Sequence, residues 1–296
     1  MSMLRMGRSR HPASRDTCAS MRIAMWSGPR NISTAMMRAF ENRSDCTVSD
    51  EPLYAAFLKQ TGLDHPGAAE VIADGECDWQ RVTETLTGPV PGGKPLWYQK
   101  HMSHHLLPGM DRDWIHGLSN AFLIRHPHAV VASYIKSRAE VAPEDIGLLQ
   151  EAELFDELRE RSGNAPPVID STEFLADPRG HLQALCDHFG FAFEDRMLHW
   201  PAGPRDSDGI WAKYWYDAVW RSTGFEARPE QLPVLSRQHQ AIADACLPAY
   251  ERLHGRTADK STATDTKAET NTHTDASAAG GGAQPGGVMD SLGELL

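Results

Sequence analysis

The chain has 296 residues, 41% of them hydrophobic, which is enough for a sizeable core. A net charge of −11 argues against a general nucleic-acid-binding protein, which would present a basic face. No stretch approaches the roughly 18 apolar residues of a membrane span. Five widely spaced cysteines without a C-x-x-C pair indicate a reducing, cytoplasmic compartment and no zinc site.

The first predicted elements are a strand over 22–27, a tight glycine-containing turn and a helix over 33–43. This arrangement points backbone N–H groups and a helix N-terminus at one place, which favours an anion, most often phosphate. Arg30 would add a forked cation, and Ser33 and Thr34 would add hydroxyl donors. An ordinary connecting turn without a ligand is the other interpretation.

The turn is not a Walker A loop, which requires G-x-x-x-x-G-K-[ST]. Counting from Gly28, neither the second glycine nor the lysine of that motif is present. The side chain that reaches the outer phosphates of a nucleoside triphosphate is therefore missing from this loop.

Polar residues follow the next two predicted strands, 46–50 and 94–100. Asp50 and Glu51 end the first, at the strand edge where open α/β sheets bind ligands, although such carboxylates also serve as helix caps. His101 follows the second and fits a general base. It begins a histidine-rich run without H-x-x-x-H spacing, so we expect no metal.

A strongly apolar strand over 120–125 is followed by a predicted helix over 127–138. Arg125 ends the strand and Ser133 lies two turns into the helix, so a second anion would fit between them. The alternative is a structural arginine paired with a surface carboxylate.

The remaining pattern alternates helices and strands, which favours a parallel sheet with helices on both faces. An aromatic stretch over 199–225 carries Lys213 and Arg221 and predicts either a platform for a planar ring and phosphate or a packed amphipathic helix. The other predicted elements are helices near 79–86 and over 143–161, a strand over 168–170, a helix over 177–189 capped by Gly190, and a helix over 229–253.

We expect a flexible extension over 1–20, one α/β domain over 21–255 and a disordered low-complexity tail over 256–296.

Three stretches occurring in order resemble sulfotransferases that use 3′-phosphoadenosine-5′-phosphosulfate (PAPS). The segment 29–34, PRNIST, is similar to the family's phosphosulfate loop P-[KR]-S-G-[ST]-T, with Ile32 in place of its glycine. Arg125 and Ser133 are spaced as in its 3′-phosphate motif, and 170–179 is similar to its Y-E-D-L-x-x-D-P stretch. The stretches MWSGPRNIST, DEPLY, YQKH and IRHP resemble a bacterial subgroup more closely, which is also similar to a domain joined to aminotransferase-like sequences in plants.

The resemblance implies a P-loop NTPase-like sulfotransferase architecture and sulfuryl transfer from PAPS to a hydroxyl or amine of a small-molecule acceptor, without metal. Arg30 would stabilise the charge on the leaving oxygen, Arg125 and Ser133 would hold the 3′-phosphate, and Glu51 or His101 would be the base, with Glu51 slightly favoured. Lys213 or Arg221 would replace a closing R-K-G stretch that is absent. The residues expected to bind the donor are Gly28, Pro29, Arg30, Asn31, Ile32, Ser33, Thr34, Arg125, Ser133, Lys213 and Arg221.

Two alternatives belong to other functional classes. One is a non-catalytic protein that holds a phosphorylated adenosine nucleotide or a sulfated ligand. The other is a kinase with a degenerate loop, which would need ATP and Mg²⁺. The sequence identifies neither the acceptor nor the oligomeric state.

Overall fold

A computed structural model describes residues 20–136, 138, 140–227 and 232–255. Its centre is a five-stranded sheet in the order β2-β3-β1-β4-β5, with every pair parallel. The predicted α/β class with a parallel central sheet is therefore confirmed. The strands are β1 (Met21–Ser27), β2 (Cys46–Asp50), β3 (Leu96–Met102), β4 (Ser119–Ile124) and β5 (Val168–Asp170).

The strand register brings the predicted polar residues to one edge. Ser27, at the end of β1, lies opposite Met102 of β3 and Leu123 of β4, and Asp50 of β2 lies opposite Lys100 of β3. Because the strands are parallel, the residues after β1, β2 and β4 all leave the sheet at its carboxyl edge, where open α/β sheets bind their ligands.

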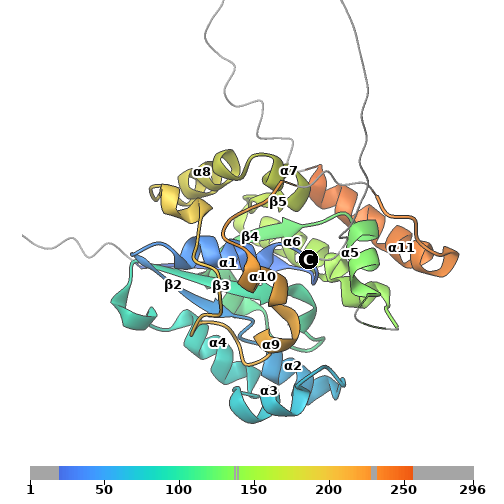
Figure 1. The fold of residues 1–296 in the computed structure, drawn as a ribbon. Helices are drawn as coiled ribbons and strands as arrows, with labels where there is room; N and C mark the ends of the chain where they lie inside the picture. The colour runs from blue at the N-terminus through green and yellow to red at the C-terminus, as the bar shows by residue number, and fades with distance from the viewer. Residues whose placement is uncertain (1–19, 137, 139, 228–231, 256–296) are drawn as a thin grey trace, which may run out of the picture.

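Helices cover both faces of the sheet (Figure 1). α1 packs beside β2 and β3, whereas α6 and α11 pack on β1, β4 and β5. The helices are α1 (Ser33–Glu41), α2 (Tyr54–Thr61), α3 (Ala68–Asp74), α4 (Trp79–Thr87), α5 (Pro127–Tyr134), α6 (Leu148–Ser162), α7 (Ser171–Ala176), α8 (Pro178–Phe189), α9 (Ala212–Trp215), α10 (Asp217–Arg221) and α11 (Arg237–His254).

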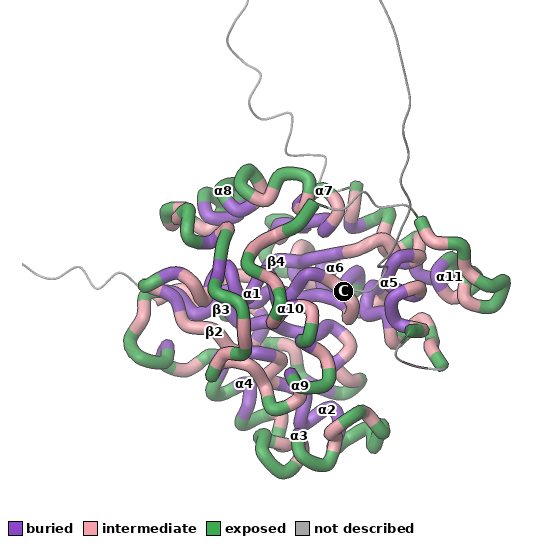
Figure 2. Tube along the Cα trace, in the orientation of Figure 1, coloured by how far each residue is buried: buried purple, intermediate pink, exposed green. Residues whose placement is uncertain are grey.

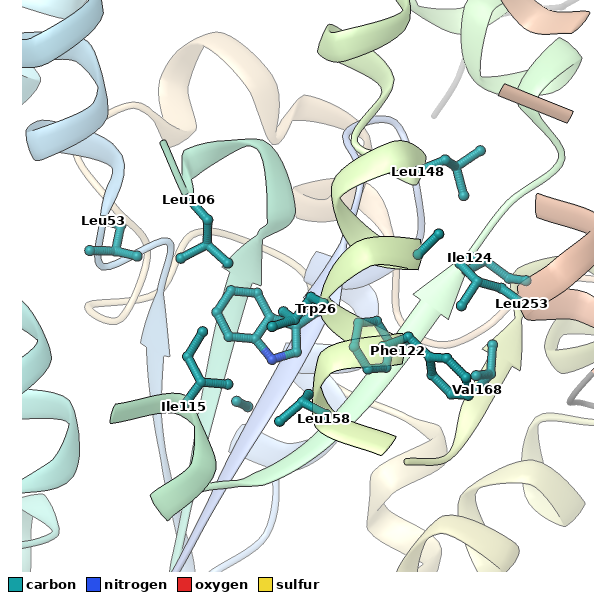
Figure 3. Close-up of a cluster of buried hydrophobic side chains, with 14 of the residues drawn as sticks. Trp26, Leu53, Leu106, Ile115, Phe122, Ile124, Leu148, Leu158, Val168 and Leu253 are labelled. Carbon is teal, nitrogen blue, oxygen red and sulfur yellow. The ribbon is translucent and has the colours of Figure 1, made fainter. Parts of the chain in front are cut away.

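Alternation along β1 divides the core in two. Ala24 and Trp26 point into one apolar cluster, and Ile23 and Met25 point into the other, on the opposite face. Figure 3 shows the first cluster, where Trp26 and Phe122 of the sheet lie among side chains of α6 and the segments around it. β3 is buried along its whole length, as its position between β2 and β1 requires (Figure 2).

The helix predicted over 143–161 is two elements. Pro143–Ile146 forms a short 3₁₀ turn, and α6 begins only after Gly147, whose φ of 80° interrupts the helical backbone. The helix predicted over 127–138 ends at Tyr134. The strand predicted over 94–100 is shifted to 96–102.

Helices α2 and α3 were not predicted. They lie between β2 and β3 in the chain and extend together away from α7 and α8 at the opposite end of the molecule (Figure 1). The aromatic stretch forms the two short helices α9 and α10 instead of one amphipathic helix.

The last predicted helix begins later than expected, at Arg237, where Ser236 caps it through the amide of His239. The predicted tail over 256–296, and the extension over 1–20 apart from Ser20, lie outside the described residues. None of the helices that the structure describes is long and apolar enough to cross a membrane.

Candidate active site

The loop after β1 holds its geometry through Arg30 and Asn31. Arg30 takes a left-handed backbone, with φ 57°. Asn31 fixes the loop to the sheet, because its Nδ2 donates to the Leu123 carbonyl at 2.7 Å and its Oδ1 accepts the amide of Ile32 at 2.8 Å. Ile32 has φ −81°, so the residue that replaces the family's glycine needs no left-handed conformation. Asn31 therefore supports the loop.

Gly28 lets the loop pack directly on the start of α6. A Cβ at Gly28 would lie 2.1 Å from the carbonyl oxygen of Ile146, and one at Gly147 would lie 2.8 Å from the Gly28 Cα. Glu151, in the first turn of α6, is fully buried beside this contact. Its Oε1 faces the backbone of Gly28. Burial raises the pKa of Glu151 well above its usual range, against the opposing effect of the Gly28 amide, so we expect this acid to be neutral in the fold.

Arg30, Arg125 and Ser133 meet at the ends of β1 and β4. The Nε of Arg30 donates to the Ser133 hydroxyl at 2.9 Å, and an N–H of Arg125 donates to the Arg30 carbonyl at 2.8 Å. Burial, with the nearby charge of Arg125, lowers the pKa of Arg30. Two guanidinium groups held this close favour a polyanionic ligand, because an anion offsets their mutual repulsion.

The N-terminus of α1 opens beside this pair. No side chain caps it, and its first turn contains no acidic residue. The hydroxyls of Ser33 and Thr34 make no hydrogen bond to the described part of the chain, although both residues are buried. A helix start with free hydroxyl donors is a suitable site for a phosphate or sulfate oxygen.

Glu51, directly after β2, also has a left-handed backbone, with φ 39°. In the described chain it and Arg30 are the two residues other than glycine with a positive φ. Strained backbone of this kind concentrates at functional sites. Burial raises the pKa of Glu51 above its ordinary value, against the opposing charge of Lys100.

A buried polar network holds Glu51. The ammonium group of Lys100 lies 2.7 Å from Glu51 Oε1, 2.9 Å from Asp50 Oδ1 and 2.6 Å from the Tyr216 hydroxyl. Burial alone would lower the pKa of Lys100, but the two carboxylates outweigh it and hold the pKa well above its usual range. Sequence reasoning missed Lys100 and Tyr216 as site residues. The signal for Lys100 was its place as the last residue of the predicted strand, whereas nothing near Tyr216 in the sequence indicated its partners.

His101 lies in the core. It is a residue of β3, opposite Trp26 in the register, and it is 1% exposed. Its ring stacks on the Trp26 indole with centroids 4.4 Å apart, and its Nε2 pairs with Gln99 Oε1 at 3.2 Å. Burial lowers the pKa of His101 to about 3. This placement corrects the expectation of an accessible base after the strand, because the imidazole is enclosed in the core beside Trp26.

Lys213 and Arg221 bind carboxylates on the surface. The ammonium of Lys213 pairs with Glu70 of α3, and Arg221 pairs with Asp217 within α10. About half of each side chain is exposed. They therefore occupy ion pairs of their own and do not join the Arg30 group as the structure stands.

A second polar group lies beyond the loop, around Tyr54 and Tyr134. The Tyr54 hydroxyl is 2.8 Å from His65 Nδ1, and Arg138 donates to His65 Nε2 at 2.7 Å and to the Tyr134 hydroxyl at 3.3 Å. No three His, Cys, Asp or Glu side chains within the described ranges are arranged to hold a metal ion.

Comparison with known proteins agrees with this fold. The family model of the sulfotransferase domain matches residues 21–257, and the chain belongs to this family. The structure is similar to that of a sulfotransferase from Alicyclobacillus acidocaldarius, with a TM-score of 0.50 and 11% identity over 81% of this chain and 96% of the other, which shows the fold.

Two Arabidopsis thaliana proteins are similar in sequence. They are named branched-chain-amino-acid aminotransferase-like protein 2 and protein 1, and each is 36% identical to this chain, over 231 and 232 residues. The matched region is 78% of this chain and 41% of each relative. The chain thus spans less than half the length of these curated relatives.

Proposed function

We propose that this protein transfers a sulfuryl group from PAPS to the hydroxyl or amine of a small acceptor. The observation that carries the proposal is the contact of Arg30, Ser133 and Arg125 beside the uncapped start of α1. Its donor set suits a ligand with two separate phosphate groups, since guanidinium groups, hydroxyls and a helix N-terminus converge there.

The residues present fit the donor. Ser33 and Thr34 have hydroxyls available for the phosphosulfate, and Arg30 supplies a fixed positive charge next to them. Arg125 and Ser133 are the expected partners of the 3′-phosphate. PAPS, when bound, supplies the sulfuryl group and leaves as adenosine 3′,5′-bisphosphate. Preorganised donors at the leaving oxygen give the electrostatic stabilisation that usually contributes most to such a reaction.

Glu51 is the proposed base. Its carboxylate accepts the proton of the acceptor while the acceptor oxygen or nitrogen forms a bond to sulfur and the sulfur–oxygen bond to the phosphate breaks. Burial favours this role, because a raised pKa makes a carboxylate a stronger base. Lys100 binds Glu51, and Tyr216 binds Asp50. This hydrogen-bond network holds the proposed base in one position.

The first experiment is a calorimetric titration of the protein with adenosine 3′,5′-bisphosphate, with ATP and Mg²⁺ as the control. We expect binding of the bisphosphate that is weakened in Arg125→Ala. Binding of ATP with Mg²⁺ alone would indicate the kinase alternative. If neither nucleotide binds, the proposed function is wrong.

A non-catalytic nucleotide-binding protein is the second candidate. The observation that favours it is the 2.7 Å ion pair with Lys100, which occupies one oxygen of Glu51. The two candidates separate in a turnover assay with PAPS and a panel of alcohols, phenols and amines. Binding of the bisphosphate without transfer to any acceptor would support the second candidate.

A further inference from the structure

Arg138, just beyond the end of α5, is a half-buried cation whose contacts are with neutral groups. Its two hydrogen bonds go to His65 Nε2 and the Tyr134 hydroxyl, and its guanidinium lies 5.8 Å from the centre of the Tyr134 ring. Burial, together with the charge of Arg138, lowers the pKa of His65 to about 4, so the imidazole is neutral.

Two other buried arginines, Arg38 and Arg43, are paired with carboxylates. Arg38 pairs with Glu41 and Asp208, and Arg43 pairs with Asp45 and Glu194. Within the described residues Arg138 has no ion pair. The nearby Asp145 influences the pKa of His65, but its carboxylate accepts the Ala142 amide. A half-buried charge without a counter-ion is costly, and a ligand anion removes that cost.

The position of Arg138 relates it to the proposed reaction. Tyr134 adjoins Ser133, the partner of Arg30, and the charges of both Arg30 and Arg138 act on its pKa. On the other side, Tyr54 binds His65 and begins the helix that follows Glu51. The charge of Glu51 contributes, after burial, to raising the pKa of Tyr54. Tyr134 therefore connects Arg138 to Arg30, and Tyr54, through His65, connects it to Glu51.

His65 orients the guanidinium. Because an arginine only donates, His65 Nε2 must accept, and the ring proton is then on Nδ1, where it donates to Tyr54. One edge of the guanidinium is fixed in this way, and its remaining N–H groups are available as a fork, the geometry that matches a carboxylate or phosphate.

We propose that Arg138 binds an anionic group of the acceptor, so that the acceptor is a hydroxy or amino compound bearing a carboxylate or a phosphate. This inference rests on the proposed function, because it assigns the substrate class of the same site.

The test is a binding comparison of three charged probes with neutral analogues of the same shape: acetate with acetamide, benzoate with benzamide, and phenyl phosphate with phenol. Each is titrated into the wild-type protein, Arg138→Gln and Arg138→Lys, with and without saturating adenosine 3′,5′-bisphosphate. Arg161→Gln is the matched control, because Arg161 is an exposed arginine paired with Asp113 on the surface.

We expect at least one charged probe to bind roughly tenfold more tightly than its neutral analogue, the size of one charge-assisted hydrogen bond. Arg138→Gln should abolish this preference, Arg138→Lys should retain part of it, and Arg161→Gln should leave it unchanged. Affinity for the bisphosphate should be the same in all four proteins.

Three results would overturn the inference: no preference for any charged probe, a preference that persists in Arg138→Gln, or a loss of bisphosphate affinity in that variant, which would place Arg138 at the donor. Failure of the bisphosphate to bind the wild-type protein would contradict the proposed function separately, since the probe comparison without nucleotide still reports on Arg138.

Discussion

Lys100 and Glu51 form a buried ion pair at the carboxyl edge of the sheet, with the ammonium nitrogen 2.7 Å from the carboxylate. The side chain of Lys100 is 2% exposed, and that of Glu51 is 14% exposed. The lysine is therefore closed off from solvent, whereas part of the carboxylate surface remains accessible to it.

Replacing Glu51 with Gln should therefore remove turnover and spare nucleotide binding. We expect the rate of transfer to fall by roughly 10²–10⁴-fold, the range for loss of a general base. Affinity for adenosine 3′,5′-bisphosphate, measured by calorimetry, should stay within a few-fold. The exposed variant Glu84→Gln serves as the charge-matched control. Transfer at the wild-type rate in Glu51→Gln would exclude this residue as the base.

The same carboxylate determines the acid limb of the pH profile. A base must be ionised to work, and the pKa of Glu51 is raised above its ordinary 4.5 by burial. Activity should therefore fall on acidification at a pH higher than an exposed glutamate would give. The measurement is kcat/KM between pH 4 and 8, compared with a stability curve over the same range to separate titration of Glu51 from unfolding.

His101→Gln should leave the transfer rate within a few-fold of wild type, because the imidazole lies in the core and not at the carboxyl edge. Its effect should appear in acid stability instead. The pKa of His101 is lowered by burial to about 3 from 6.5, so between these values the unfolded chain binds a proton that the folded chain does not. Wild-type stability is lost as pH falls through this window, and the variant should lose less. A large loss of transfer rate at every pH tested, in a His101→Gln variant that remains folded, would contradict this prediction and support His101 as the base.

Glu151→Gln should change how stability depends on alkaline pH. The buried carboxyl keeps its proton in the fold, whereas the unfolded chain releases it above about 4.5. Stability therefore declines by up to about 1.4 kcal/mol per pH unit until the folded group ionises. The amide cannot ionise, so urea unfolding at pH 5 and pH 8 should show the variant gaining on the wild type at pH 8. An equal difference at both values would mean that Glu151 is charged in the fold.

Gly28→Ala should disable the donor loop. Its Cβ would lie 2.1 Å from a backbone oxygen, so either the loop or the start of α6 must move. We expect a large drop in bisphosphate affinity together with a lower unfolding temperature. Gly117→Ala is the control, since a Cβ there meets no atom within 4 Å. Undiminished affinity in Gly28→Ala would show that the loop tolerates the shift.

The sheet was predictable because its signals are local. β1 and β4 are apolar runs followed by polar residues, and α8 lies between clear boundaries, Asp177 and Gly190. Helix α2 was missed because its mainly apolar sequence, YAAFLKQT, shows only a weak alternation between apolar and polar faces. The break before α6 depends on the left-handed conformation of Gly147, which packing against Gly28 requires and which the sequence around it does not indicate.

The candidate site was predictable in part. Arg125 was expected at the end of a strand, Ser133 on the helix that follows it and Arg30 in the turn after the first strand, and the structure places them there. These positions were predictable because segments that follow parallel strands converge at one edge of the sheet. His101 was misplaced because a shift of the predicted strand by two residues turned a core position into an edge position. Tyr216 and Glu151 contact residues more than a hundred positions away in the sequence, Lys100 and Gly28. Arg138 contacts His65, 73 positions away. A pattern read over a short stretch of sequence does not reveal such contacts.

Helices α2 and α3 contribute no strand to the sheet and lie wholly between β2 and β3. They nevertheless supply Tyr54 and the connection that carries His65. On the proposed function, donor recognition and acceptor choice would be carried by separable pieces of one chain. Replacing the segment of α2 and α3 would then be expected to change the acceptor and leave nucleotide binding as it is.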